Sequence, residues 1–394
     1  MKSLRLGFIP LSDCAVLAVA AERGFFRREG LDVTLSREAS WANIRDKVAV
    51  GALDGAQMLA GMPLAATTGI DRVAQPLVTA FSLGLNGNAI TVSKDVWAAM
   101  VAADPGAAIR PTTAASLRTV IAAGRRDGRT PLRFAMVYPF GMQNYELRYW
   151  LASAGIDPDR DVQLSVVPPP RMVEALQNGA IDGFCVGEPW NSVAVQRGIG
   201  RIVVSKVELW RNSPEKVLAV NQAFADKEPE VHRALLRALI EAARWSDADE
   251  NRRDLALILA EPRYVGAPKG LLAGPLAGRL ILGPDGEETA LPDFHVFHRY
   301  AANFPWTSHA MWLLAQMRRW RQLVELIDSR AIARAVYRPD LYREAARDAG
   351  VSAPLVDEKS EGTHAGTWQM EGSAGAIEMG SDLFFDGAVF HPGE

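Results

Sequence analysis

Residues 166–191 constrain the fold of this chain more than any other segment. They read VVPPPRMVEALQNGAIDGFCVGEPWN, in which a strand runs into three prolines, then a short helix with an apolar face, then a second buried strand. Proline cannot continue a strand ladder but suits the first turn of a helix, and Gly179 can take the left-handed conformation that ends one. Strand, helix and strand in so few residues predict an α/β unit, and the loop that starts at Gly187 is expected to border a ligand site.

A regular alternation of strand and helix begins near the N-terminus. Residues 4–9 read as a buried strand, Ser12 or Asp13 as the N-cap of a helix, and residues 31–35 as the next strand. Ser40 then caps a second helix. Strands that alternate with helices build a sheet covered by helices, with ligands at the carboxyl ends of the strands. We therefore predict an α/β fold.

Two segments are expected to carry the chain between two such sheets. Residues 78–93 hold two strand-like pieces around the turn signal at 86–88, and a return is expected at 203–208. Two crossings make a hinge, and a cleft between hinged lobes closes over small ligands. The predicted domains are lobe 1, residues 1–85 and 208–394 with a helical C-terminal region and tail, and lobe 2, residues 86–207.

Composition argues against several classes of protein. The chain has 394 residues, 48% hydrophobic and 23% charged, which is ordinary for a folded globular protein. A net charge of −3 without a basic cluster argues against direct binding of nucleic acid. No run of about 18 apolar residues occurs, so no membrane span is expected.

The sequence enters a core strand at once instead of a secretory leader, so we expect a cytoplasmic protein. The polar, glycine-rich residues 356–381 suit a surface loop or mobile tail.

Patterns typical of enzymes and metal sites are poor in this sequence. It has no G-x-S-x-G elbow, P-loop, G-x-G-x-x-G turn after a strand or H-E-x-x-H helix. His295 and His298 have helical spacing, but a structural role is favoured over a shared metal because no acidic or cysteine third ligand stands beside them. Cys14 and Cys185 lie in apolar segments and are interpreted as buried thiols. We expect no catalytic residue, no metal and no cofactor.

Residues 166–191, with their PPP-x-M helix and the run DGFCVGEPWN, resemble the nitrate- and bicarbonate-binding proteins of bacterial ABC uptake systems and their soluble relatives. The similarity extends to LRLGFIPLSDCAVLAVAAERGFFRREGLDV near the start, ASW at 39–41, DGAQMLAGMP at 54–63, RYWLASAGIDPDRDV at 148–162 and PEKVLAV at 214–220. It is good over residues 4–225 and thinner beyond. The resemblance implies an α/β, two-lobed type II periplasmic-binding-protein-like fold with a ligand cleft between the lobes and a helical C-terminal extension.

A binder of a small oxyanion needs donors from both lobes, few carboxylates and one cation where water is excluded. Trp41 follows the N-cap Ser40 at a helix start, where its indole N–H and the helix dipole can face an anion. A tryptophan there is more often a packing residue, but the resemblance matches it to one that touches the ligand. At the first crossing, Gly84 allows close backbone approach and Asn88 can donate through its amide. The residues alone favour a plain turn; the resemblance places a glutamine donor at the position of Asn88.

Four further residues complete the predicted site. Pro169 matches a ligand-shaping proline of the family and also suits a plain helix start. A lone lysine is usually a solvated surface group, but Lys216 lies near the return crossing and matches the cleft lysine whose ammonium pairs with nitrate. Gln143 stands where the nitrate binders have a histidine; its amide can donate but cannot carry a proton-dependent charge. Glu188 is interpreted as set back from the anion, where it orients donors or caps the next helix, with a bicarbonate-type hydrogen bond as the alternative.

The predicted function is that of a cytosolic nitrate or nitrite sensor. The resemblance to the cytosolic members of the family implies that the anion binds between the lobes and releases an ANTAR-type RNA-binding antiterminator, which controls nitrate assimilation genes. The alternative is the substrate-binding component of a nitrate or bicarbonate ABC transporter. A third possibility is an enzyme like those of thiamine-pyrimidine biosynthesis, which share a related fold and use an active-site histidine as a substrate. No histidine is expected in the cleft, which counts against it.

Overall fold

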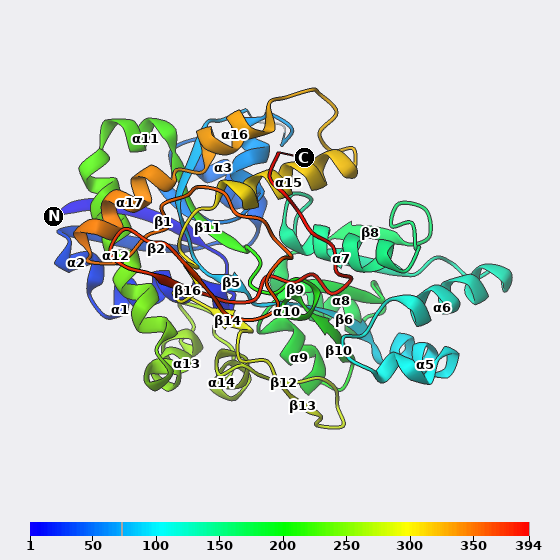
Figure 1. Ribbon diagram of the computed structural model, residues 1–394. Helices are drawn as coiled ribbons and strands as arrows, with labels where there is room; N and C mark the ends of the chain where they lie inside the picture. The colour runs from blue at the N-terminus through cyan, green and yellow to red at the C-terminus, as the bar shows by residue number, and fades with distance from the viewer. Residues whose placement is uncertain (72–73, 394) are drawn as a thin grey trace.

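The computed structural model describes residues 1–71 and 74–393 and contains two five-stranded sheets, each in its own lobe (Figure 1). The first sheet has the order β2-β1-β3-β11-β4. Its strands are β1 (Lys2–Phe8), β2 (Leu31–Arg37), β3 (Gly55–Leu59), β4 (Leu77–Ser82) and β11 (Lys216–Asn221). β1 runs parallel to β2 and β3, whereas β11 runs antiparallel to β3 and β4.

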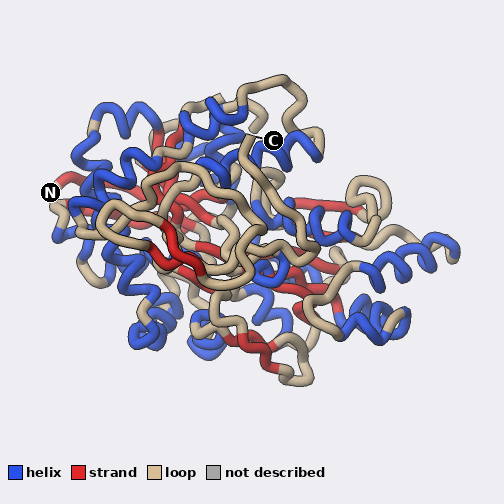
Figure 2. The backbone as a smooth tube through the Cα atoms, in the orientation of Figure 1, coloured by secondary structure: helices blue, strands red, loops and turns tan. Residues whose placement is uncertain are grey.

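Helices cover both faces of the first sheet (Figure 2). Side chains of β11 alternate between the two cores, since Val217 and Ala219 enter one and Leu218 enters the other. The helices of this lobe up to residue 247 are α1 (Ala15–Glu22), α2 (Phe25–Arg28), α3 (Trp41–Ala49), α4 (Met62–Thr67), α11 (Gln222–Lys227) and α12 (Pro229–Asp247). A sheet with two apolar faces has to be sandwiched in this way, which is why its strands read as nearly continuous hydrophobic runs.

The second sheet has the order β10-β6-β9-β7-β8. Its strands are β6 (Asn88–Ser93), β7 (Arg133–Met136), β8 (Gln163–Val166), β9 (Gly183–Gly187) and β10 (Gly200–Ser205). β7 runs parallel to β8 and β9, and β6 runs antiparallel to β9 and β10. The helices of this lobe are α5 (Lys94–Ala103), α6 (Ala115–Arg126), α7 (Met142–Ser153), α8 (Met172–Gln177) and α9 (Trp190–Gln196), with 3-10 turns at Pro105–Ala108 and Pro169–Arg171.

The chain crosses between the sheets twice. It leaves the first sheet after β4, passes through β5 (Leu85–Asn86) and enters β6; it returns after β10 through α10 (Lys206–Leu209) to β11. Gly179 has the left-handed conformation expected after α8, with a φ of 64°. The two-lobed α/β fold is therefore confirmed, while the exact lobe boundaries at 85/86 and 207/208 stay a prediction.

The C-terminal region is helical, and it contacts both lobes. It contains α13 (Arg252–Ala260), α14 (Lys269–Leu276), β12 (Arg279–Ile281), β13 (Glu288–Ala290), β14 (His295–Val296), α15 (Thr307–Arg319), α16 (Ser329–Val336), α17 (Pro339–Asp348), β15 (Trp368–Met370) and β16 (Ile377–Met379). Leu280 and Leu282 pack with Ile202 of β10, whereas Tyr342 of α17 packs in the core around α12. In Figure 1 the last segment, in red, crosses the molecule from β16 towards α7.

The structure corrects two local expectations. Neither Ser12 nor Asp13 caps α1; both lie in a 3-10 turn (Ser12–Cys14) with buried side chains, and the residue at the N-cap of α1 is Cys14. Residues 356–381 do form a long loop, but it includes the β15–β16 hairpin and Glu361, which is fully buried. Asp13 points inward because Lys216 and Gln57 meet its two carboxylate oxygens.

Candidate functional site

The predicted site residues lie where the two sheets present the carboxyl ends of their parallel strands. Trp41 follows β2, Gln143 follows β7, and Glu188 follows β9. Antiparallel strands begin at the same edges: Lys216 opens β11 opposite Leu59, the last residue of β3, and Asn88 opens β6 opposite Gly187. The backbone amide of Ser12 in the first lobe donates to the carbonyl of Glu188 in the second, over 2.8 Å. The two edges therefore face each other, as expected for a site in an α/β protein.

Trp41 is placed by its helix. It is the first residue of α3, whose N-cap Ser40 accepts a hydrogen bond from the amide of Asn43 at 3.2 Å. The indole is 1% exposed, and its ring centroid lies 5.6 Å from the ammonium of Lys216, a cation–π contact. Within the described part of the chain, its Nε1 has no hydrogen-bond partner. A buried N–H without a partner is costly, so this donor is available for a ligand.

Lys216 is 1% exposed and is held between two carboxylates. Its ammonium lies 2.7 Å from Asp13 Oδ2 and also contacts Glu215. Burial disfavours the charged ammonium, but Asp13 and Glu215 outweigh burial and raise the pKa of Lys216 above its ordinary value. The cation that the sequence predicts is therefore present and charged.

Glu215 is the centre of the buried network. Its carboxylate contacts the ammonium groups of Lys206 and Lys216 and accepts hydrogen bonds from Asn88 Nδ2 and Gln143 Nε2, both at 2.6 Å. Burial raises the pKa of this carboxyl, but the two ammonium groups outweigh burial and hold it below its ordinary value. Three of the donors that the sequence assigns to an anion, on Asn88, Gln143 and Lys216, thus converge on one planar carboxylate.

Asn88 and Gln143 come from the second lobe and are fully buried. Gln143 Nε2 also donates to Asn88 Oδ1 at 3.0 Å, and Asn88 Nδ2 lies 3.2 Å from both oxygens of Glu146. Gln143 Oε1 finds no partner among the described residues. The network therefore links both lobes through side-chain amides whose orientation is fixed by their neighbours.

Glu188 is 1% exposed and directly follows β9, which ends at Gly187. Its Oε2 accepts a hydrogen bond from the amide of Ser192 in the first turn of α9 at 3.2 Å, which is the capping arrangement that the sequence suggests. In the described structure its Oε1 has no partner. Burial raises the pKa of Glu188 to about 7, so this carboxyl is largely protonated in mildly acidic solution. Whether Glu188 acts on a ligand stays a prediction.

Gly84 and Pro169 bring no side-chain donor to the network. Gly84 has a φ of 153°, and a Cβ there would lie 2.7 Å from the carbonyl oxygen of Val296, so its role in this structure is close packing against β14. Pro169 is buried and opens the 3-10 turn before α8, as expected of a helix start. Their contacts with a ligand also stay predictions.

Five residues of the network were not predicted from the sequence, and the network holds more carboxyls than were expected around an anion. The missed residues are Asp13, Gln57, Glu146, Lys206 and Glu215. Lys206 lies 2.9 Å from Glu146 and is 1% exposed. A signal existed for two of them, since Lys206 lies in the predicted return crossing and Glu215 adjoins Lys216 in the matched run PEKVLAV.

The histidine pair is not helical. His295 lies in β14, where its ring stacks on Phe297, and burial lowers its pKa to about 3. His298 Nδ1 lies 2.8 Å from Asn303 Oδ1. Over residues 1–71 and 74–393, no group of three or more His, Cys, Asp or Glu side chains is arranged to hold a metal ion. Both cysteines are buried thiols, as expected.

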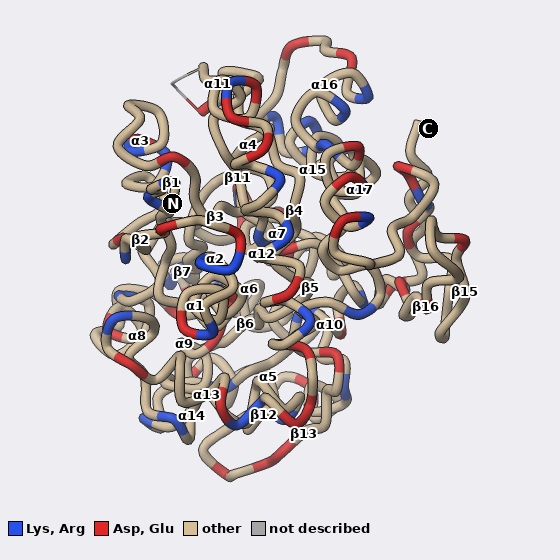
Figure 3. Tube along the Cα trace, turned by 90° about the vertical axis from the view of Figure 1, so that its left-hand side faces the viewer, with Lys and Arg blue, Asp and Glu red and all other residues tan. Residues whose placement is uncertain are grey.

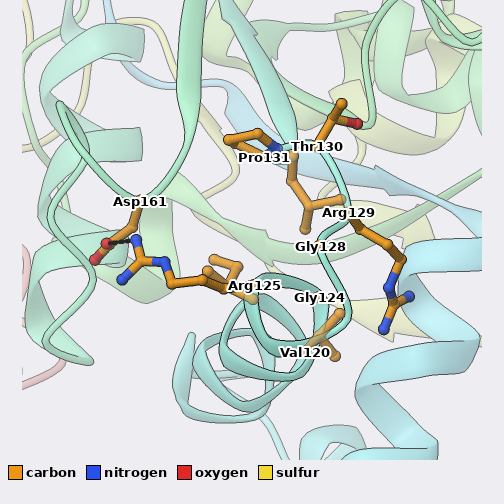
Figure 4. Close-up of a pocket in the computed structure, with 10 residues that line it drawn as sticks. Val120, Gly124, Arg125, Gly128, Arg129, Thr130, Pro131 and Asp161 are labelled. Carbon is orange, nitrogen blue, oxygen red and sulfur yellow. Dashed lines mark hydrogen bonds and ion pairs between the residues drawn. The ribbon is translucent and has the colours of Figure 1, made fainter.

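A cavity outside the buried network is lined in part by charged side chains. A cavity of about 220 Å³ lies beside α6, where Arg125 and Asp161 form an ion pair at 2.6 Å (Figure 4). Arg125 is 67% exposed, so this pair is open to water and screened. In Figure 3 positive and negative residues alternate over the elements in view. None of the helices in the described ranges is long and apolar enough to cross a bilayer.

Comparison with known proteins decides the family. The model of the NMT1-like family matches residues 1–260. The chain belongs to the NMT1-like family. The crystal structure of the periplasmic nitrate-binding protein NrtA from Synechocystis superposes with a TM-score of 0.87 at 30% identity, covering 100% of this chain and 96% of that one.

Two curated relatives extend the comparison of this NMT1-like protein. It is 31% identical to the bicarbonate-binding protein CmpA of Synechococcus elongatus over 406 residues, 100% of this chain and 84% of CmpA. It is 40% identical over 400 residues to the nitrate import ATP-binding protein NrtC of Synechocystis sp., 100% of this chain but 54% of NrtC. The chain thus spans about half the length of the ATP-binding relatives that it matches. These relatives are named for binding an anion or ATP, not for transforming a substrate.

Proposed function

We propose that this protein binds a small planar oxyanion between its lobes, with nitrate and nitrite as the first candidates and bicarbonate as the next. The observation that carries the proposal is the convergence of donors from both lobes on one planar carboxylate, that of Glu215. Nitrate, nitrite and bicarbonate are planar oxygen acceptors like a carboxylate, so donors arranged for one suit the others. The free indole N–H of Trp41 adds a donor beside the ammonium of Lys216.

The relatives support the same ligand class. NrtA is named for binding nitrate and CmpA for binding bicarbonate, and these two ligands are small oxyanions of similar shape. Lys216 suits nitrate or nitrite, because these anions have no O–H group and need only a cation and hydrogen-bond donors. A bicarbonate site gains more from an acceptor for the ligand's own O–H group.

The biological role that we propose first is the anion-binding component of a nitrate or bicarbonate ABC import system. Its support is the similarity to NrtA, CmpA and NrtC over the whole of this chain. The P-loop motif is missing from this sequence, so ATP binding is not part of the proposal.

The second candidate is the cytoplasmic sensor predicted from the sequence, which would release an ANTAR-type antiterminator when the anion binds. The hydrogen bond from Ser12 to Glu188 and the network through Glu215 join the two lobes beside the proposed site, so an anion that replaces one of these contacts would alter how the lobes are held together. A ligand that favours the closed form changes the affinity of any partner that contacts both lobes. In this role nitrate should weaken the complex with the antiterminator; equal affinity by calorimetry with and without saturating nitrate would rule it out.

Anion binding itself is tested by fluorescence titration of the purified protein with nitrate, nitrite and bicarbonate. Trp41 reports on the site, so a saturable change with nitrate or nitrite is expected. Lys216→Ala should abolish it, and Lys94→Ala, on an exposed residue of α5, should leave it unchanged. If no anion binds, or if Lys216→Ala binds as well as the native protein, the proposed function fails.

A further inference from the structure

The buried network carries more negative than positive groups. Two ammonium groups, on Lys206 and Lys216, face three carboxyls, and all five side chains lie in residues that are 8% exposed or less. The carboxyls belong to Asp13, Glu146 and Glu215. An added anion makes this imbalance larger in a place that water does not reach, and an uncompensated buried charge costs several kcal/mol.

Asp13 is the carboxylate that an anion on Lys216 would displace. Among the described residues Glu215 is held by four side chains, Lys206, Lys216, Asn88 and Gln143, and the first two are ammonium groups. Asp13 has one ammonium partner, Lys216 at 2.7 Å, and one amide donor, Gln57 Nε2 at 2.6 Å. An anion that takes the place of Asp13 beside Lys216 leaves a buried carboxylate without its cation.

The groups around Asp13 favour its protonation once Lys216 turns to a ligand. Lys216 and Glu215 face it from the start of β11, and Gln57 faces it from β3. Cys14 adjoins it in the chain, and a Cβ added at Gly187 of β9 would lie 3.6 Å from its Oδ2. Burial already raises the pKa of Asp13, and the main opposing influence is Lys216. Nearby His295 stays neutral because burial keeps its pKa low.

We propose that the site takes up its anion together with one proton, and that the carboxylate of Asp13 accepts this proton. This inference rests on the proposed function. The anion accepts a hydrogen bond from the Lys216 ammonium in place of Asp13 Oδ2, and a proton from solvent adds to the Asp13 carboxylate. The resulting neutral acid still accepts from Gln57 at Oδ1. The added negative charge of the ligand and the added positive charge of the proton cancel, so the net charge of the buried network does not change.

The experiment counts protons on the native protein. Nitrate binding is measured by titration calorimetry at pH 7 in buffers of different ionisation enthalpy, and the slope of the observed enthalpy against that enthalpy gives the proton number. We expect uptake of about one proton, and a Kd that rises about tenfold for each pH unit between 7 and 8. Asp13→Asn mimics the neutral acid, so its proton uptake and the pH dependence of its Kd should vanish. Asp254→Asn, an exposed carboxylate on α13, should behave as the native protein does.

The outcomes separate this inference from the proposed function. Binding of nitrate without proton exchange overturns the inference and leaves the proposed function intact. Uptake that persists in folded Asp13→Asn but disappears in Glu146→Gln overturns the assignment to Asp13. If no anion binds to the native protein, the proposed function itself fails. If Asp13→Asn does not fold, the proton count on the native protein still tests the uptake, and loss of that uptake in folded Glu146→Gln overturns the assignment to Asp13.

Discussion

The ammonium of Lys216 lies 2.7 Å from Asp13 Oδ2, and both side chains are buried at the edge of the first sheet. Asp13 lies in the loop after β1, and Lys216 is the first residue of β11, the strand that follows the return crossing. The pair therefore links the loop after β1 to the start of β11. Glu215 completes the triad and extends it to Asn88 and Gln143 of the second lobe. The proposed anion site and the junction of the lobes are therefore built from the same charges.

The first prediction concerns the stability that this pairing provides. Lys216→Met should lower the free energy of unfolding by about 3–5 kcal/mol, because it leaves Asp13 and Glu215 buried without their shared cation. Urea denaturation followed by far-UV circular dichroism measures the change. Lys94→Met removes an exposed lysine and should change stability by less than about 0.5 kcal/mol. Equal stabilities of the two variants would show that the buried pairs contribute little.

The second prediction separates the two functions of the Trp41 ring. Trp41→Phe keeps an aromatic face near the Lys216 ammonium but removes the unpartnered N–H. The affinity for nitrate should fall about tenfold, the effect of losing one hydrogen bond to a charged group, while the melting temperature stays close to that of the native protein. Calorimetry measures the affinity. Trp320→Phe, at the end of α15, is the matched control and should bind nitrate normally; an unchanged affinity of Trp41→Phe would remove the indole from the site.

Much of the fold could be predicted because its signals are local. Ser40 caps α3 and Gly179 ends α8, and both act within one turn of their own helix. The first crossing was recognisable because apolar strand patterns flank Asn86 and Gly87. Asp13 shows the limit of this approach, since an aspartate before an apolar helix is a typical N-cap in sequence. Its contacts with Lys216 and Gln57 are not local in sequence, and they override that local preference.

The site was predictable only in part for the same reason. Trp41, Asn88, Gln143 and Lys216 were selected through the family resemblance, and the structure brings them into one network. The carboxylates that balance Lys216 carry no local signal, because a charged residue at a loop or helix start is most often solvated. Glu146 lies on α7 among residues that read as an ordinary amphipathic helix, yet it is 5% exposed and 2.9 Å from Lys206. Long-range charge pairing has no sequence period to detect.

A third prediction follows from the pKa of Glu188, which burial raises to about 7 from an ordinary value of 4.5. Between these two pH values the folded protein keeps a proton on Glu188 that the unfolded chain releases. The contribution of Glu188 to stability is therefore largest below pH 4.5 and is lost as the pH rises through about 7. The loss is on the order of 3 kcal/mol. Glu188→Gln should remove this fall and be more stable than the native protein at pH 8.

Urea titrations at several pH values between 5 and 8 measure this effect. Glu174→Gln, an exposed glutamate on α8, is the control and should keep the native pH dependence. A Glu188→Gln variant whose stability falls with pH as steeply as the native protein's would show that Glu188 titrates normally.

The last prediction concerns the C-terminal segment where it meets the return crossing. The ring of Phe384 stacks on Trp210 at 4.6 Å, and backbone hydrogen bonds join Arg211 to Leu383 and Phe385 to Leu209. Phe384→Ala should lower the free energy of unfolding by about 3 kcal/mol, because Phe384 is 5% exposed and removal of its ring leaves a cavity. Hydrogen exchange should accelerate at the amides of Arg211 and Phe385 before the rest of the lobe. Val389→Ala, half-exposed in the same segment, should leave both amides protected; unchanged exchange in Phe384→Ala would mean that the stacked ring does not hold the segment on the crossing.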